Sequence, residues 1–430
     1  MSARLDAGFA PAAPRSSALP ALMLLGVTIL SAAAMRTVFS PVQDLAKAEL
    51  QLSDFQLSLV QGLAAALPVA LLSIPIGRMT DRGNRMRLLT ALAALWTLGT
   101  IGTAFATEFY SLFVARMFAG LGAMCAIPVA ISLAADLSAP EQRGRSLLIL
   151  SIGNTAGAAA AFALTGVVLT AARAMPDLAL GLAPWRVVHI GFGLASLALL
   201  LPLLAMREPG RREMGEAVHT ALKPALAAIW KRRALLAPLF LGQVTVVMAD
   251  TAAGIWAAPV LSRSYGLAPE DFAGWMGLVI LASAIIGSVI GGLAADAGHK
   301  SKIKGGILLG AVVAAALSIP GALFPVMPST TTFALSLTLF LTCGAITGLV
   351  TSTAIAVLVP NEIRGVCLGA FIVLGAIVGL GIAPTLVTMI SDSLGGGGAI
   401  RYGLAITGAA TSIIAALGFG AAFLSQQRAD

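Results

Sequence analysis

Charged residues are scarce in this chain, and their scarcity limits what kind of protein it can be. Only 11% of the 430 residues are Asp, Glu, Lys or Arg, whereas 58% are hydrophobic. A water-soluble fold of this length could not bury so much apolar surface, so we expect lipid to surround most of the chain. A soluble, nucleic-acid-binding protein is therefore excluded, although the formal charge is +8.

Cysteine and histidine are also rare, with three residues of each. The cysteines, Cys125, Cys343 and Cys367, all fall within apolar runs, which excludes a disulfide framework. The histidines share no spacing typical of metal ligands, so we predict neither a metal site nor another cofactor. No nucleophile–base pair is recognisable, and we expect no enzymatic activity.

Twelve apolar runs are long enough to cross a bilayer, which takes about 20 residues. They form two groups of six, so we predict an all-α membrane protein with twelve transmembrane helices in two pseudo-symmetric six-helix bundles. The length of the first run favours a retained span over a cleaved signal peptide. The predicted spans are 18–40, 56–77, 88–106, 110–135, 146–172, 185–206, 234–258, 273–296, 303–327, 332–357, 367–392 and 402–424.

A charged stretch separates the two groups. We predict an N-terminal bundle at 1–206, a cytoplasmic linker at 207–233 and a C-terminal bundle at 234–430. Apolar residues recur at helical spacing between Val218 and Trp230. Both a helix on the inner membrane surface and a solvated tether fit this stretch.

The distribution of positive charge predicts the orientation. With both termini in the cytoplasm, twenty of the 27 Lys and Arg lie in inside loops and five lie outside. Cytoplasmic loops of membrane proteins carry such an excess. We expect a monomeric, multi-pass protein of a bacterial-type inner membrane.

One pattern occurs twice, 215 residues apart, which is half the chain length. Residues 77–85 read Gly-Arg-Met-Thr-Asp-Arg-Gly-Asn-Arg, and residues 292–300 read Gly-Leu-Ala-Ala-Asp-Ala-Gly-His-Lys. A Glu-x-Arg-Gly motif likewise occurs at 141–144 and at 362–365. Repeats in transporters build a pathway at their interface, so a duplicated membrane unit makes a transporter our first hypothesis.

These features resemble the major facilitator superfamily along essentially the whole chain. The matching motifs are Gly-x-x-x-Asp-Arg-x-x-Arg after span two, Arg116-x-x-x-Gly120-x-Gly122 in span four and Trp185-Arg186 at span six. In that superfamily the loop after span two clasps the halves together on the cytoplasmic side. The resemblance therefore implies a cytoplasmic gate that includes Gly77, Asp81, Arg82, Gly83, Arg85, Asp296, Lys300, Arg143 and Arg364.

Within the superfamily, the stretch from about Leu50 to Gly157 is most similar to the Spinster group of lipid-linked transporters. The shared motifs are Leu-Ser-Asp-x-Gln at 52–56, Ile-Pro-Ile-Gly at 74–77, Thr-Asp-Arg-Gly-Asn-Arg at 80–85 and Pro-Glu-Gln-Arg-Gly-Arg at 140–145.

The chain also departs from that group. Met35 replaces the usual acid before Arg36, and Ala123 replaces a usual Glu in span four. Both acids linked to ion coupling in that group are missing, so the resemblance does not establish its proton-linked mechanism or its lipid substrate for this chain. The proline of the drug-antiporter motif is also absent after Gly157.

Two arginines lie within predicted spans. Arg36 lies 17 residues after Leu19, which is about 25 Å at about 1.5 Å per residue. A guanidinium at that depth is costly unless it faces a wet cavity or an anion, although it can also snorkel outward. Arg116 is either a second cavity residue or a donor to backbone carbonyls.

Asp250 is the one acid placed inside a predicted span. An intramembrane carboxylate is a functional candidate, and it can pair with Arg36 or Arg116 or carry a coupling proton. Polar neighbours that could line the same substrate cavity are Gln61, Asn154, Gln243 and Trp256. The hydroxyls of span ten, such as Thr351, are more often structural.

We therefore predict a secondary transporter, symporter or antiporter, that moves a small or amphipathic solute by alternating access. Two arginines against one carboxylate favour an organic anion as substrate. A lipid or drug exporter of the same fold, and a non-transporting membrane sensor built on it, remain alternatives.

Overall fold

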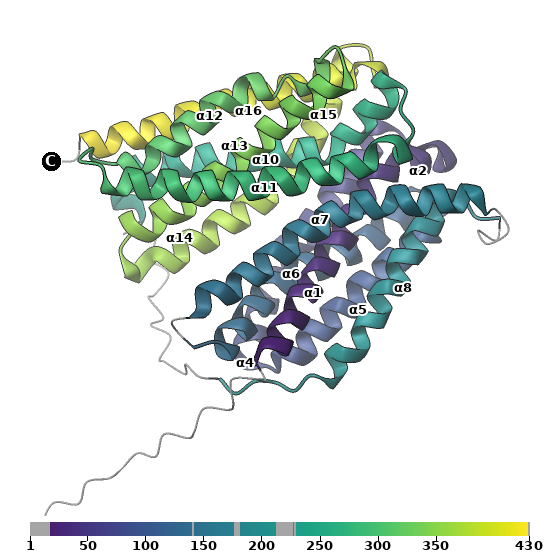
Figure 1. Ribbon diagram of the computed structural model, residues 1–430, viewed down its shortest axis with the longest axis horizontal. Helices are drawn as coiled ribbons and strands as arrows, with labels where there is room; N and C mark the ends of the chain where they lie inside the picture. The colour runs from purple at the N-terminus through teal and green to yellow at the C-terminus, as the bar shows by residue number, and fades with distance from the viewer. Residues whose placement is uncertain (1–17, 140–141, 176–180, 212–226, 228, 429–430) are drawn as a thin grey trace, which may run out of the picture.

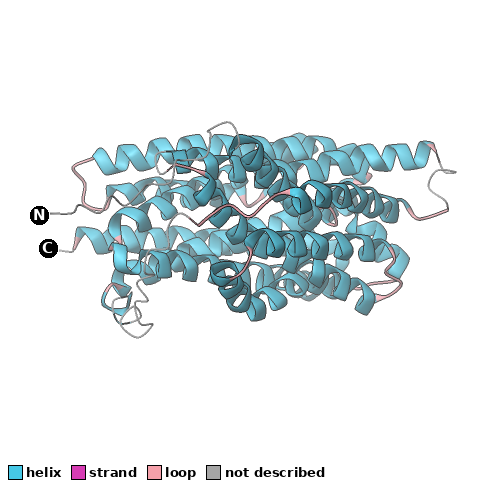
Figure 2. Ribbon diagram, turned by 90° about the horizontal axis from the view of Figure 1, so that it is seen from below, coloured by secondary structure: helices cyan, strands magenta, loops and turns pink. Residues whose placement is uncertain are grey.

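The computed structural model describes residues 18–139, 142–175, 181–211, 227 and 229–428, and all the regular structure in these residues is helical (Figure 2). Twelve helical runs in this part of the chain are long and apolar enough to cross a membrane. The predicted all-α fold with twelve spans is confirmed. The predicted surface helix before Trp230 lies almost entirely outside the described residues.

The first six spans are built from ten helical segments. They are α1 (Ala18–Thr37), η1 (Ser40–Val42), α2 (Gln43–Leu50), α3 (Asp54–Ser58), η2 (Leu59–Leu63), α4 (Ala64–Arg82), α5 (Arg85–Ala104), α6 (Phe109–Leu137), α7 (Arg143–Ala174) and α8 (Pro184–Ala205).

The last six spans use eleven segments. They are α10 (Arg233–Tyr265), α11 (Pro269–Lys300), η4 (Gly306–Leu308), α12 (Leu309–Gly321), η5 (Phe324–Val326), α13 (Thr330–Leu358), α14 (Asn361–Leu374), η6 (Gly375–Leu380), α15 (Gly381–Ser393), η7 (Gly397–Ala399) and α16 (Ile400–Gln427).

Side-chain caps set several helix starts. Ser53 and Gln56 form a reciprocal capping box at the start of α3, with hydrogen bonds of 2.9 and 3.1 Å. Asn84 accepts from the backbone N–H of Arg87 at 2.7 Å and starts α5. Gly266 ends α10 with a positive φ of 70°, which a glycine adopts without strain. These local signals hold the turns between spans.

The helices form two bundles that diverge from a shared end (Figure 1). Helix α7 of the first bundle packs along α11 of the second, and η2 and α3 of span two pack against α15 of span eleven. We call the end that carries α2 and the α10–α11 turn the clasped end. We call the opposite end, where α4 ends and α14 begins, the linker end; there the bundles lie apart in Figure 1.

Spans two and eleven both contain a π-helical segment, η2 and η6. The segments touch, because Gly62 of η2 lies against the backbone oxygen of Leu380, where a Cβ would collide. Pro384, four residues after Leu380, has no N–H to offer that oxygen. The two helices thus meet where both depart from regular α geometry.

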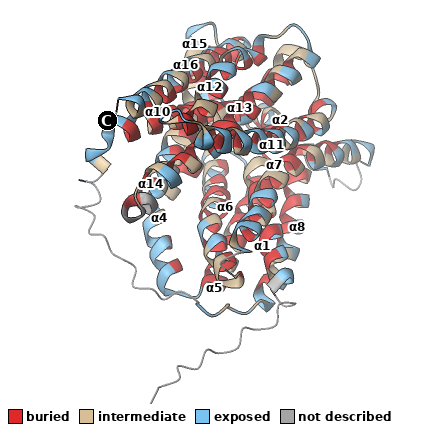
Figure 3. Cartoon of the chain, turned by 60° about the vertical axis from the view of Figure 1, so that its left-hand side comes forward, coloured by how far each residue is buried: buried red, intermediate tan, exposed pale blue. Residues whose placement is uncertain are grey.

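Residues on the outer faces of both bundles are exposed (Figure 3), and many of them are large and apolar. Leu71, Ile74, Leu201 and Leu278 are each at least 67% exposed. A monomeric protein in water rarely exposes so much large apolar surface, so lipid chains cover these faces.

Candidate functional site

Arg36 lies in the last turn of α1, half-buried, and its guanidinium makes no hydrogen bond or ion pair with any described residue. Arg85 and Arg263, by contrast, each bond two carboxylates. Because α1 runs from the linker end towards the clasped end, Arg36 lies on the linker side of Ser40, about one helical turn away.

Arg116 is buried on α6, where it bonds the backbone of α1. Its Nη1 donates to the carbonyl of Met35 at 3.2 Å, and its Nη2 donates to the carbonyl of Arg36 at 2.7 Å. The guanidinium also lies 5.3 Å from the ring centroid of Phe39. Of the two roles weighed for Arg116, the structure places it in the backbone-bonding one, away from open space in this conformation.

Four charged residues join the bundles at the clasped end. Arg263 of α10 donates to both carboxylate oxygens of Asp44 on α2, at 2.6 and 2.9 Å, and to Asp54 on α3 at 2.8 Å. Lys47 donates to the other oxygen of Asp54 at 2.6 Å. We call these four residues the ionic clasp. Arg173 of α7 and Glu270 of α11 form a further ion pair between the bundles.

Two glutamine side chains form a hydrogen-bonded layer next to the ionic clasp. Gln61 donates to Ser40 at 3.1 Å and to Gln43 at 3.3 Å, and Gln43 donates to the carbonyl of Ile255 on α10 at 2.5 Å. Gln61 and Gln43 are both buried. The predicted cavity residue Gln61 thus belongs to a buried hydrogen-bonded layer, which Gln43 links to α10 of the other bundle.

The other predicted cavity residues have different surroundings. Asp250 is half-buried, and its carboxylate faces Gly344 of α13 within its own bundle, without an ion pair to Arg36 or Arg116. Gln243 accepts from Thr351 at 2.8 Å. Trp256 is fully buried and donates to the carbonyl of Pro384 at 3.1 Å. Asn154 on α7 is half-buried with no hydrogen-bond partner among the described residues.

The predicted gate residues lie at the linker end, and their surroundings differ. Asp81, Arg82, Asp296 and Lys300 are exposed, and none of these four bonds another described residue. Gly77 is also exposed, with open space where a Cβ would stand, whereas Gly83 ends α4 by donating to the carbonyl of Met79 at 2.8 Å.

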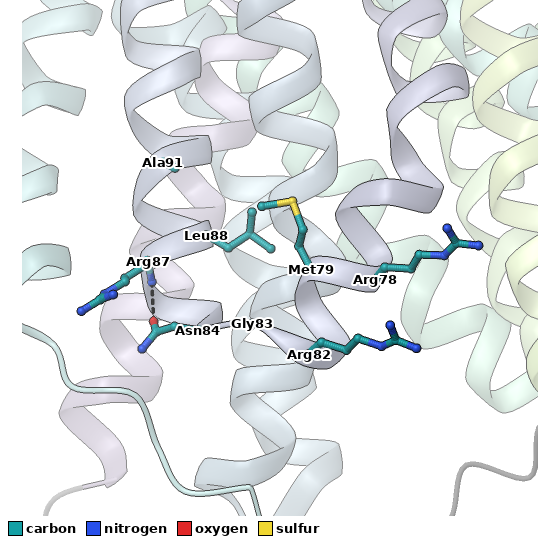
Figure 4. Close-up of a pocket in the computed structure, with 8 residues that line it drawn as sticks. All are labelled: Arg78, Met79, Arg82, Gly83, Asn84, Arg87, Leu88 and Ala91. Carbon is teal, nitrogen blue, oxygen red and sulfur yellow. Dashed lines mark hydrogen bonds between the residues drawn. The ribbon is translucent and has the colours of Figure 1, made fainter.

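Figure 4 shows Arg82 and Arg78 extending from the same side of α4, while Arg87 points the opposite way. These side chains line a hollow of about 610 Å³ between α4 and α5 with an apolar floor that includes Met79, Leu88 and Ala91. The arginines do not converge on one point, so the hollow lacks a focused anion site.

Arg85 differs from the other predicted gate residues. It is only 2% exposed, and it bonds Asp136 of α6 and, at 2.8 Å, Glu208 beyond α8. Its partners all lie within residues 1–211, so it stabilises one bundle and does not face the other. Arg143 is half-buried at the start of α7, and the side chain of Arg364 lies outside the described residues.

Sequence reasoning missed the ionic clasp. The five cations predicted to lie outside include Lys47 and Arg263, but the acids Asp44 and Asp54 were given no role. The sequence did contain one indication of this cluster: Asp44 and Asp54 flank Lys47 in a predicted outside loop. Few charged residues lie in the outside loops, so a group of three is unusual there.

The two ends of the molecule differ in the contacts that join the bundles. Hydrogen bonds and ion pairs join the bundles at the clasped end, whereas Asp81, Arg82, Asp296 and Lys300 at the linker end bond no other described residue. The bundles are thus joined at one end and lie apart at the other (Figure 1).

Comparison with known proteins agrees with this architecture. The Major Facilitator Superfamily model matches residues 25–384. The 3-(3-hydroxy-phenyl)propionate transporter of Escherichia coli K12 is 36% identical over 103 residues, covering 24% of this chain and 25% of that protein. Human protein spinster homolog 1 is 28% identical over 261 residues, covering 58% of this chain and 47% of that protein. The matched regions thus span between a quarter and a half of these relatives.

Solved structures share the fold over nearly the full length. A bacterial homolog of the human lysosomal transporter Spinster, in an inward-facing and unoccupied conformation, superposes with a TM-score of 0.78 at 22% identity, covering 97% of this chain and 98% of that one. The nucleoside transporter NupG superposes with a TM-score of 0.71 at 13% identity, covering 96% and 99% of the two chains. The chain therefore belongs to the Major Facilitator Superfamily, a family of multi-pass membrane transporters.

Proposed function

We propose that this protein is a secondary active transporter that moves an organic anion by alternating access. The observation that carries the proposal is the half-buried guanidinium of Arg36 in the last turn of α1, which has no partner among the described residues. A charge at that depth is expensive without a partner, and an anionic substrate supplies the missing partner. Arg36 is then the anion-binding residue.

One relative supports this substrate class. The Escherichia coli protein is named as a transporter of 3-(3-hydroxy-phenyl)propionate, which is an aromatic carboxylate. A carboxylate accepts two parallel hydrogen bonds from a guanidinium, so Arg36 suits such a group. Asn154, which lacks a partner, is the residue we assign to hydrogen bonding with the remainder of the substrate.

We further propose that the linker end faces the cytoplasm, with both termini on that side of an inner membrane. The excess of Lys and Arg in the loops of that end supports this orientation. The conformation described above is then inward-facing. Residues 1–206 and 234–430 act as the two moving bundles, and residues 207–233 link them.

Asp250 is our candidate for the coupling or counter-charge residue. Its carboxylate lies in the second bundle, whereas Arg36 lies in the first. The two residues therefore act on different ligands in this proposal, with the anion bound at Arg36 and the coupling ion at Asp250.

The test is uptake of radiolabelled 3-(3-hydroxyphenyl)propionate by proteoliposomes that contain the purified protein. Arg36→Ala lowers uptake about tenfold or more, as expected for the loss of a charged hydrogen bond worth about 1.5–3 kcal/mol. Arg36→Lys retains part of the activity because it keeps the charge without the bidentate fork. Arg145→Ala is the matched control, because Arg145 is exposed at the start of α7.

Unchanged uptake in Arg36→Ala contradicts the assignment. Export of a lysolipid that is independent of Arg36 supports the lipid or drug exporter instead. Ligand-induced thermal stabilisation without any flux supports the non-transporting sensor.

A further inference from the structure

The second bundle contains a small internal cavity of about 10 Å³ beside Asp250. A single water molecule needs roughly 10–15 Å³ of such space and two to four polar partners. The cavity lies between α10, α12, α13 and α16. It is lined by Val246, Ala249, Asp250, Ser318, Phe340, Cys343, Gly344, Thr347 and Ser412.

The carboxylate of Asp250 occupies the side of this cavity that Gly344 leaves open. A Cβ at position 344 would overlap both carboxylate oxygens, lying 2.6 Å from Oδ1. Asp250 makes no hydrogen bond or ion pair with any described residue. The carboxylate of Asp250 therefore fits at this position because Gly344 has no side chain.

Three hydroxyls complete the cavity. Ser318 donates to the carbonyl of Ala315 at 2.8 Å, and Thr347 donates to that of Gly344 at 2.8 Å, so both oxygens keep lone pairs for a further donor. Ser412 is 2% exposed, and its hydroxyl has no hydrogen-bond partner among the described residues. A water in the cavity can thus bond Asp250, Ser412 and one further oxygen.

No cation in the described structure balances Asp250. Among the lining residues, Cys343 is the only other titratable group. Helices α12 and α13 contain no charged residue, and α10 carries Arg233 and Arg263 only near its ends. Arg401 on α16 lies eleven residues before Ser412 and bonds Tyr402. The other helices that pack on α10 carry their charged residues towards their ends: Glu270, Asp296 and Lys300 on α11, Asp44 and Lys47 on α2, and Asp392 on α15. The charged side chains of α14 lie outside the described residues.

We propose that Asp250 is a proton-binding site in which one water joins the carboxyl group to the hydroxyl of Ser412. An ionised carboxylate at this depth lacks a counter-charge, and adding a proton removes that cost. Protonation forms an O–H bond at one carboxyl oxygen, and the proton comes from and returns to water.

The position of Asp250 connects the site to the interface between the bundles. The next residue, Thr251, has its hydroxyl 3.5 Å from where a Cβ would stand on Gly379 of η6. Segment η6 touches η2 of the other bundle. Charging Asp250 draws in water and separates α10 from α13, and the shift of α10 reaches span eleven through Thr251. This coupling role rests on the proposed transport function, whereas the proton site itself rests on the cavity.

Infrared difference spectroscopy of the full chain in lipid nanodiscs, between high and low pH, tests the site without any substrate. The wild type shows a carboxylic C=O band that titrates, and Asp250→Asn removes it. Ser412→Ala shifts the frequency of that band. Gly344→Ala shifts its titration, whereas Gly348→Ala, whose Cβ meets only Gln243 at 3.9 Å, leaves it unchanged.

A band that survives in Asp250→Asn, or one that responds to Na⁺ instead of pH, overturns the proton site. Coupling is read separately in proteoliposomes, where Asp250→Asn retains substrate exchange but loses accumulation driven by a proton gradient. If the band titrates and no organic anion is transported, the site stands and the proposed substrate class fails.

Discussion

At the scale of single residues, Arg116 holds the backbone of α1 at Met35 and Arg36. The last carbonyls of a helix have no hydrogen-bond donor within that helix. At the end of α1, Arg116 donates to the carbonyls of Met35 and Arg36. Its ring contact with Phe39 fixes the next turn of the chain. Arg116 is therefore a positioning residue, and it leaves the side chain of Arg36 free.

We expect Arg116→Leu to lower the free energy of unfolding by about 3 kcal/mol, because two charged hydrogen bonds to buried carbonyls are lost. Thermal unfolding of the detergent-solubilised protein, followed by tryptophan fluorescence, measures the change. Arg87→Leu, at an exposed arginine, is the control and leaves the stability unchanged. Equal stability of Arg116→Leu and wild type contradicts the positioning role.

Both intramembrane arginines were identified from the sequence, but their separate roles were not. Hydropathy shows that a charge lies inside a span, whereas its partner depends on how α6 approaches α1. Asp250 was found in the same way. Its neighbour Gly344 lies 94 positions further along the chain, so no local pattern could indicate the cavity beside the acid.

At the scale of helices, the ionic clasp and the contact between η2 and η6 hold one end of the molecule closed. Arg263 reaches acids on two different segments, α2 and α3, which ties span seven to spans one and two. The residues are half-buried or nearly buried, so solvent only partly weakens their attraction. Opening this end requires these bonds to break.

We expect Asp44→Asn to shift the equilibrium towards opening of the clasped end by on the order of 1–2 kcal/mol, after allowance for solvent screening. A cysteine introduced at Ala257, buried on α10 near this end, then reacts faster with a membrane-impermeant maleimide. High salt has the same effect in the wild type, because it screens the clasp. Glu108→Gln, at an acid outside the clasp, is the control. Identical labelling rates in Asp44→Asn and wild type rule out the clasp as a gate.

The clasp could not be predicted from sequence because Arg263 and Asp44 are 219 residues apart. The two π-helical segments were missed for another reason. Gly62 and the run Gly375–Leu380 read as ordinary apolar span residues, and the extra residue in the turn appears only when spans two and eleven pack together.

At the scale of the whole molecule, the two bundles meet along α7 and α11 and along spans two and eleven. Gly277 of α11 faces the backbone oxygen of Ala159 on α7, so these helices cross closely. In the proposed alternating access, one bundle turns against the other along these close crossings. The proposed cycle thus uses α7 and α11 as its pivot and the ionic clasp as one of its gates.

The number of spans and the family were predictable because both depend on patterns within the chain. Long apolar runs and the repeated Gly-x-x-x-Asp motif can be recognised in the sequence without knowing how the helices pack. Span limits were less accurate, since the first span extends to Leu50 through α2 instead of ending near residue 40. The break at Pro41 suggests an end, but the chain continues as helix after η1.

The most direct test of the account measures two distances in one protein by electron spin resonance. Labels at Asp81 and Lys300 report on the linker end, and labels at Ala48 and Leu394 report on the clasped end; all four positions are exposed. Adding a transported organic anion shortens the first distance and lengthens the second, as alternating access requires. If transport proceeds while both distances stay fixed, the two bundles do not exchange open ends, and the account is wrong.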